Sequence, residues 1–171
     1  MKRVFWMLAA CLMILSGGRA LAEEPANILA TTKRLACAYS QGMNAVFTPQ
    51  GRVNLKPPLD PNTPGLTIAI TDRSKNRAVL EEDSLETPGV LMVSPAGLSV
   101  MARYADGGVT MVTVYPVHAG ASDNLLMVSS RHGAGAEPHI SQRYGFCRPG
   151  LETPLPAEPP APPPAKKGGH G

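Results

Sequence analysis

Histidine is the residue type in this sequence with the widest chemical use. His132 and His139 stand seven residues apart in a glycine-rich stretch, and His118 lies upstream of both. Imidazole nitrogens bind zinc or copper and transfer protons near neutral pH, so convergence of these three side chains would create a metal or hydrolytic site. The spacings match no known metal-ligand motif. We therefore keep a metal-binding or hydrolytic enzyme that uses these loop histidines as the alternative function, and we assign no metal ligands.

The sequence contains no recognisable catalytic nucleophile. Ser130 stands near His132, but neighbours along a strand point to opposite faces, so closeness in sequence does not create a catalytic dyad. The patterns Gly-x-Ser-x-Gly and Ser-x-x-Lys are both absent. The acidic run at 81–83 precedes an expected turn at Pro88-Gly89, which is typical of solvated charge. We therefore expect a protein that is not an enzyme and needs no cofactor.

Two arginines flank the histidines and extend the set of candidate ligand-binding residues. Guanidinium groups bind anions through paired N–H donors, although they also form ordinary surface ion pairs. The candidate set is Arg131, His132, His139 and Arg143. Five methionines fall inside apolar strand patterns, where packing in the core is the ordinary role, and these are Met43, Met92, Met101, Met111 and Met127.

The first 22 residues have the pattern of a secretory signal peptide. Lys2 and Arg3 precede an apolar run over Val4–Leu15, and small residues around Ala22 predict a cleavage site. A membrane-spanning helix needs about 20 apolar residues, so we expect cleavage, no transmembrane segment in the mature chain, and a periplasmic or secreted location. Leu8–Cys11 resembles a short lipobox, so lipidation of Cys11 is the alternative to cleavage after Ala22.

Removing the leader changes both the charge and the cysteine count. The loss of Lys2, Arg3 and Arg19 leaves 13 basic residues against 13 acidic ones, which argues against a nucleic-acid partner. Cys37 and Cys147 remain, and an even pair in an oxidising compartment favours a disulfide over two redox-active thiols. In the chain-entropy model a bridge that closes about 110 residues stabilises the fold by about 4–5 kcal/mol.

Short apolar runs separated by turn residues dominate the region 35–149. Leu66–Thr71 alternates as a half-buried strand should, and Asp106-Gly107 marks a tight turn. Val109–Val117 is a continuous apolar run that predicts a central strand covered on both faces. About eight such strands predict an all-β domain, a compact antiparallel sandwich or barrel.

Two segments flank this β-rich domain. Residues 23–34 form a linker or a short helix, for which Asn27–Leu35 is the candidate with Asn27 as its cap. Residues 150–171 hold seven prolines and predict a disordered tail with local polyproline II structure. The tail is either a solvated extension or a stiff spacer that presents a basic tip.

The segment Met127–His132, followed by Ser141–Cys147 and taken with Cys37–Ser40, resembles a pattern in small exported proteins of uncharacterised function from Gram-negative bacteria. The resemblance spans most of Leu35 to Cys147, and it implies a periplasmic β domain without implying an activity. We expect a non-catalytic binding or structural module of the periplasm. Its partner would be an unknown protein, an envelope polymer or a small ligand.

Overall fold

The computed structural model describes residues 24–48, 50, 52–56, 63–120, 122–134 and 138–150. The predicted signal peptide lies outside these residues, as does all of the predicted tail except Gly150. The elements within the described ranges are α2 (Pro25–Thr31), β1 (Arg34–Phe47), β2 (Val53–Lys56), β3 (Leu66–Asp72), β4 (Arg77–Glu82), β5 (Leu85–Ser94), β6 (Gly97–Arg103), β7 (Val109–His118), β8 (Leu125–Gly133) and β9 (His139–Pro149).

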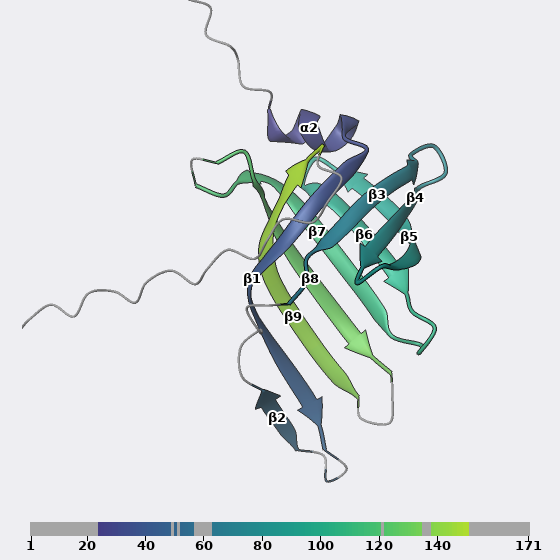
Figure 1. The fold of residues 1–171 in the computed structure, drawn as a ribbon, viewed down its shortest axis with the longest axis vertical. Helices are drawn as coiled ribbons and strands as arrows, with labels where there is room; N and C mark the ends of the chain where they lie inside the picture. The colour runs from purple at the N-terminus through teal and green to yellow at the C-terminus, as the bar shows by residue number, and fades with distance from the viewer. Residues whose placement is uncertain are drawn as a thin grey trace, which may run out of the picture.

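The strands form a closed antiparallel barrel, which confirms the predicted fold class (Figure 1). Eight strands follow one another around it in the order β1, β3, β4, β5, β6, β7, β8 and β9, and β9 pairs with β1 to close the ring. Closure satisfies the backbone groups that an open sheet would leave at its edges. Within the described sheet, the short β2 pairs with the end of β1, between Asn44 and Phe47.

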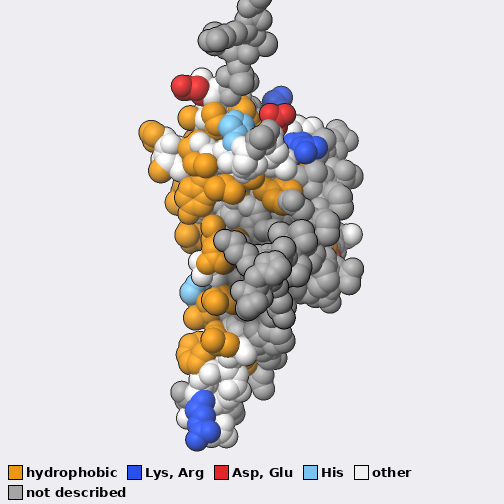
Figure 2. All heavy atoms as spheres, turned by 90° about the vertical axis from the view of Figure 1, so that its left-hand side faces the viewer, with side chains coloured by type: hydrophobic (Ala, Val, Ile, Leu, Met, Phe, Trp, Pro, Cys, Tyr) orange, Lys and Arg blue, Asp and Glu red, His pale blue; other side chains and the backbone are white. Residues whose placement is uncertain are grey.

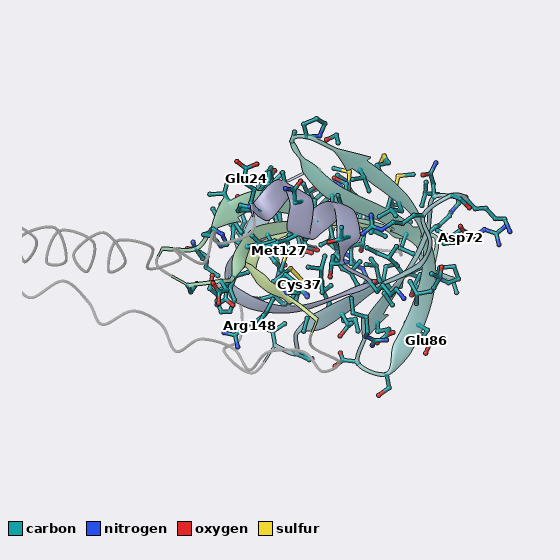
Figure 3. The ribbon with its side chains drawn as sticks, turned by 90° about the horizontal axis from the view of Figure 1, so that it is seen from above. Glu24, Cys37, Asp72, Glu86, Met127 and Arg148 are labelled. Atoms are coloured by element: carbon teal, nitrogen blue, oxygen red, sulfur yellow. A yellow bond between two sulfur atoms is a disulfide. The ribbon has the colours of Figure 1, made fainter. Side chains whose placement is uncertain are left out.

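Helix α2 lies across one end of the barrel (Figure 3). Leu29 of the helix is buried in the core, and a guanidinium nitrogen of Arg73 donates to its carbonyl oxygen over 3.0 Å. The predicted bounds Asn27–Leu35 are wrong, because the helix begins at Pro25 and ends at Thr31. Pro25 suits a first helical position, since its fixed φ is already helical. The extended backbone of Thr32 then ends the helix.

The core fills the barrel interior, and side chains alternate between this interior and the outer surface. In β7 the buried positions are Thr110, Val112 and Val114, while Met111 and Tyr115 between and beyond them are exposed. The prediction that this strand is covered on both faces is therefore wrong. The barrel wall has only one packed face here, and the outward side chains of Met111 and Tyr115 are apolar without being buried.

The same alternation corrects the prediction for the methionines. Only Met127 is buried, at 1% exposure, and its label in Figure 3 lies beneath α2. Between 44% and 52% of the surface of the other four is exposed, so core packing is wrong for Met43, Met92, Met101 and Met111. Each of these four occupies an outward position of its strand. Residue type alone did not reveal the phase of the strands.

The turn predicted at Pro88-Gly89 is also wrong, because both residues lie within β5. The chain reverses earlier, at Asp83 and Ser84, whose φ angles are +50° and +64°. Strand β5 pairs with β4 over Leu85–Val90 and with β6 over Gly89–Ser94. The proline therefore lies in the half of the strand that has only one partner within the described sheet, where a missing N–H is tolerated.

Strands β1, β2 and β9 extend beyond the barrel as a short arm (Figure 1). Hydrophobic side chains run along the face that contains this arm (Figure 2), and its exposed members include Met43, Phe47, Val53, Leu55, Ile140 and Tyr144. Across the described ranges, no helix has both the length and the hydropathy needed to span a membrane.

Candidate functional site

The inner surface of β8 and β9 changes from apolar to polar along its length. Near α2 the facing pair is Leu125 with Cys147, and the next inward pair is Met127 with Gly145. Farther from the helix, Ser129 faces Arg143 and then Arg131 faces Ser141, which places both candidate arginines inside the end of the barrel that α2 does not cover. These residues share one parity along their strands, so they point to the same face as the buried Leu125 and Cys147.

Arg143 is held by a carboxylate and an aromatic ring. Its Nη1 donates to Oε1 of Glu82 over 3.0 Å, and its guanidinium carbon lies 5.0 Å from the ring centre of Tyr39. The two charged side chains are largely withdrawn from solvent, at 24% and 19% exposure. A charged hydrogen bond in such surroundings is stronger than a surface ion pair.

Arg131 repeats this arrangement on the neighbouring strand. Its guanidinium carbon lies 4.2 Å from the ring centre of Tyr104, and its Nη2 lies 3.4 Å from Oδ2 of Asp106. The hydroxyl of Tyr104 donates to Oε2 of Glu82 over 3.4 Å, which links the two arginine–tyrosine pairs through one carboxylate. The barrel end therefore holds a connected polar network built from four strands and the turn after β6.

The two tyrosines of the network are held as neutral phenols. Burial raises the pKa of Tyr39, and the negative charge of Glu82 raises it further, against the opposing effects of Arg143 and Ser129. The pKa of Tyr104 is also raised, first by burial and then by Glu82. Neutral rings keep their electron-rich faces available to the guanidinium groups that lie over them.

A cavity of about 270 Å³ opens beside this network. It is lined by Thr63, Pro64, Glu82, Asp83, Leu85, Tyr104, Arg131 and Arg143. Its charged lining contains two carboxylates and two guanidinium groups, so the formal charge is balanced. The Nε atoms of both arginines are buried without a hydrogen-bond partner among the described groups, which leaves part of their donor capacity unused.

The candidate histidines do not join this cavity's lining. His132 faces outward and is exposed, whereas Arg131 beside it faces inward. His139 begins β9 opposite Gly133, and a Cβ built on that glycine would lie 2.0 Å from its imidazole Cε1. The ring therefore packs directly over the glycine backbone, at the far end of the barrel from α2.

His118 lies at the opposite end of the barrel. It pairs with Leu125 at the start of β8, while His132 near the end of that strand pairs with Val109. Seven residues of strand correspond to about 23 Å, too far for shared metal coordination. Among the side chains that the structure describes, no group of three or more His, Cys, Asp or Glu residues could hold a metal ion. The three histidines also lie in strands, not in the predicted loop.

Sequence reasoning missed the acidic and aromatic parts of the site. The acidic run predicts solvated charge for Glu82, but this residue lies in phase with the inward-facing Leu80 and Ala78. That phase is the signal that could have identified it. Tyr39 and Tyr104 carried no such signal, because their arginine partners lie on strands that are distant in sequence.

The arrangement suits binding more readily than proton transfer. The phenols are held protonated, and guanidinium groups keep their protons throughout the physiological range. Guanidinium donors recognise planar carboxylates, and carboxylates accept from ammonium groups. No protein-family model, curated protein or solved structure matches the chain.

Proposed function

We propose that this protein is a non-catalytic binding module whose ligand enters the open end of the barrel. The observation that carries this proposal is the convergence of Arg131 and Arg143 on one cavity beside Glu82. Each arginine is positioned by a tyrosine ring and one carboxylate, so the donors are oriented before a ligand arrives. Such preorganisation lowers the entropy cost of binding.

The ligand is a small zwitterion that carries a carboxylate, an ammonium group and a short apolar part. The carboxylate meets the guanidinium groups, and the ammonium group meets Glu82 or Asp83. Leu85 and Pro64 supply the apolar wall. A cavity of about 270 Å³ lies just below the usual range for drug-sized ligands, which favours a molecule of amino-acid size.

The protein acts outside the cytoplasm, in the periplasm or as a secreted protein. Two features support this location. The disulfide between Cys37 and Cys147 is of the kind that persists in oxidising compartments. The leader-like pattern of the first 22 residues is the second feature.

A matched set of small molecules tests the zwitterion. The protein labelled with ¹⁵N is titrated with leucine, with 4-methylpentanoate, which lacks the amine, and with 3-methylbutylamine, which lacks the carboxylate. Leucine is expected to shift the amide resonances around the cavity at the lowest concentration. The amine is expected to bind most weakly, because it cannot engage Arg131 or Arg143. Equal binding of the amine, or no shift with any of the three, would refute the site.

Arg131→Gln tests the site from the protein side, since it removes a charge from the cavity and retains a polar side chain. Its expected effect is about a tenfold loss of leucine affinity, the order of one charged hydrogen bond. Arg148→Gln is the matched control. Arg148 is an exposed arginine of β9 whose Nε donates to Asn124 over 3.0 Å, and it does not line the cavity. A loss of affinity in the control alone would argue against the cavity.

A further inference from the structure

A second and larger cavity lies on the outer surface of the barrel. It has a volume of about 760 Å³ and follows the outward faces of β4, β5, β6 and the start of β7. We call it the outer groove, and its described lining is Thr71, Lys75, Asn76, Arg77, Ala78, Val79, Pro88, Gly89, Val90, Met101, Ala102, Arg103 and Val109. None of these residues lines the cavity at the barrel end.

The groove forms where the sheet divides along β5. The first half of this strand pairs with β4, its second half pairs with β6, and only Gly89 and Val90 pair with both. The pairing with β6 ends at Gly89 and Ala102, so the next residues along the two strands, Pro88 and Arg103, are not paired with each other. The absence of a side chain at Gly89 permits the close approach of β5 and β6 at this point, because a Cβ there would lie 2.8 Å from Cγ1 of Val100.

The floor of the groove is apolar and exposed. Val90 and Met101 are direct partners across β5 and β6, and about half of each side chain's surface meets solvent. Val79 and Pro88 are likewise partners across β4 and β5, and Val109 continues the floor on β7. An apolar surface of this kind gains stability when a hydrocarbon covers it.

The rim of the groove is cationic. Arg77 lies opposite Val90, and Arg103 lies opposite Val109, so each arginine borders the apolar floor. Lys75 also lines the groove, and its ammonium group pairs with Asp72 over 3.5 Å. Among the described ion pairs, none involves Arg77 or Arg103, and the described lining contains no carboxylate.

We propose that the outer groove binds an amphipathic anion, a molecule with a single hydrocarbon chain and a negatively charged headgroup. The chain covers Val90, Met101 and Pro88, and the headgroup contacts Arg77 or Arg103. A neutral apolar ligand would leave the cations without partners, and a purely polar anion would leave the floor exposed. The volume lies within the range of about 300–1,000 Å³ that small-molecule sites occupy.

Calorimetric titration of the full chain with sodium decanoate tests this inference. Acetate supplies the charge without the chain, and decyltrimethylammonium supplies the same chain with the opposite charge. Decanoate is expected to bind and acetate to show no binding. Decyltrimethylammonium is expected to bind at least tenfold more weakly than decanoate. Flotation with vesicles that contain phosphatidylglycerol distinguishes a membrane-borne acyl chain from a free one. Equal binding of the two C10 compounds would overturn the proposal.

Two exposed methionines provide the matched variants. Met101→Glu places a negative charge in the floor and is expected to weaken decanoate binding at least tenfold. Met92→Glu makes the same change at an equally exposed, outward position of β5 that does not line the groove, and it is expected to have no effect. The double variant Arg77→Gln/Arg103→Gln is expected to abolish the preference for decanoate over decyltrimethylammonium. Unchanged decanoate affinity in Met101→Glu, or an equal loss of affinity in both glutamate variants, would refute the groove as the site.

Arg131→Gln separates this site from the one at the barrel end. It is expected to leave decanoate binding unchanged, because Arg131 lies inside the barrel and does not line the groove. Loss of decanoate affinity in this variant would place the amphipath at the barrel end and overturn the outer site. Loss of leucine binding with retained decanoate binding is the expected combination.

Discussion

Cys37 and Cys147 are direct partners in the ladder between β1 and β9, and the disulfide that joins them crosses the seam where the barrel closes. Both side chains are fully buried in the core. The bond links residues 110 positions apart in sequence, so the first and last barrel strands stay together even when the chain between them unfolds. The seam has no turn to hold its strands, and the disulfide supplies that connection.

Replacing both cysteines by alanine is expected to lower the free energy of unfolding by about 4 kcal/mol, because the loop-closure entropy is no longer removed from the unfolded state. Urea denaturation monitored by circular dichroism measures the change. Reducing the disulfide of the wild-type protein with a phosphine removes the same bond but keeps both cysteine side chains. An unchanged midpoint in both samples would show that the strand pairing alone holds the seam.

Gly145→Ala is expected to destabilise the barrel by about 1–3 kcal/mol, the usual cost of overpacking. A Cβ at this position would lie 1.9 Å from the carbonyl oxygen of Ala38 on β1, so the seam must open to admit it. Gly120→Ala is the control, because among the described residues no heavy atom beyond its chain neighbours lies within 4 Å of the added Cβ, and the φ of +65° is what opposes the change. Equal losses in thermal denaturation would contradict the close approach.

The ion pair of Glu82 and Arg143 is expected to show a coupling energy above about 1 kcal/mol in a double-mutant cycle with glutamine at each position. The two groups are mostly buried, and each single change leaves the other charge without its partner. The exposed pair of Asp72 and Lys75 gives the comparison, with an expected coupling of about 0.5 kcal/mol or less. Similar coupling energies for the two pairs would show that burial does not strengthen the interaction of Glu82 with Arg143.

The stability of the fold is expected to fall as pH rises above about 10, the pKa of tyrosine in an unfolded chain. Burial raises the pKa of Tyr39 in the folded state, so at such pH the unfolded chain has lost a phenolic proton that the folded chain retains. The unfolded state then binds fewer protons, and the free energy of unfolding decreases with pH. Tyr39→Phe is expected to flatten this decrease between pH 9 and 11, measured by urea denaturation.

Tyr115→Phe is the control for that series, because Tyr115 is an exposed residue on the outer face of β7. The free energy of unfolding of Tyr39→Phe should still fall somewhat with rising pH, since the pKa of Tyr104 is also raised by burial. A slope that is unchanged in Tyr39→Phe, or flattened to the same degree in the control, would contradict the assignment to the buried phenol.

Dilute hydrogen peroxide is expected to oxidise the four exposed methionines well before Met127, because the thioether of Met127 lies within the packed core. Peptide mass mapping after timed exposure measures the sulfoxide at each position. In protein unfolded by guanidinium chloride the five rates should converge. Early oxidation of Met127 in folded protein would show that the interior opens at the end that α2 covers.

Half of the predicted binding set lies at the barrel-end site. Arg131 and Arg143 share the cavity, because two inward positions on adjacent strands lie near each other once those strands pair. His132 follows Arg131 directly, and alternation therefore places it on the opposite face. The partners Glu82 and Asp106 could not have been assigned from spacing, since the ladders that bring them to the arginines join distant segments.

Local pattern was enough to predict the β class, the paired cysteines and several strand bounds, because alternation and turn preference depend on residues a few positions apart. Leu66–Thr71 and Val109–Val117 are examples, and each of the two strands ends one residue later than predicted. Only the tertiary structure decided which face of each strand is inside. The interior exists only after β9 meets β1. Closure is a contact between the two ends of the domain, so it assigned four of the five methionines to the surface and the two arginines to one cavity.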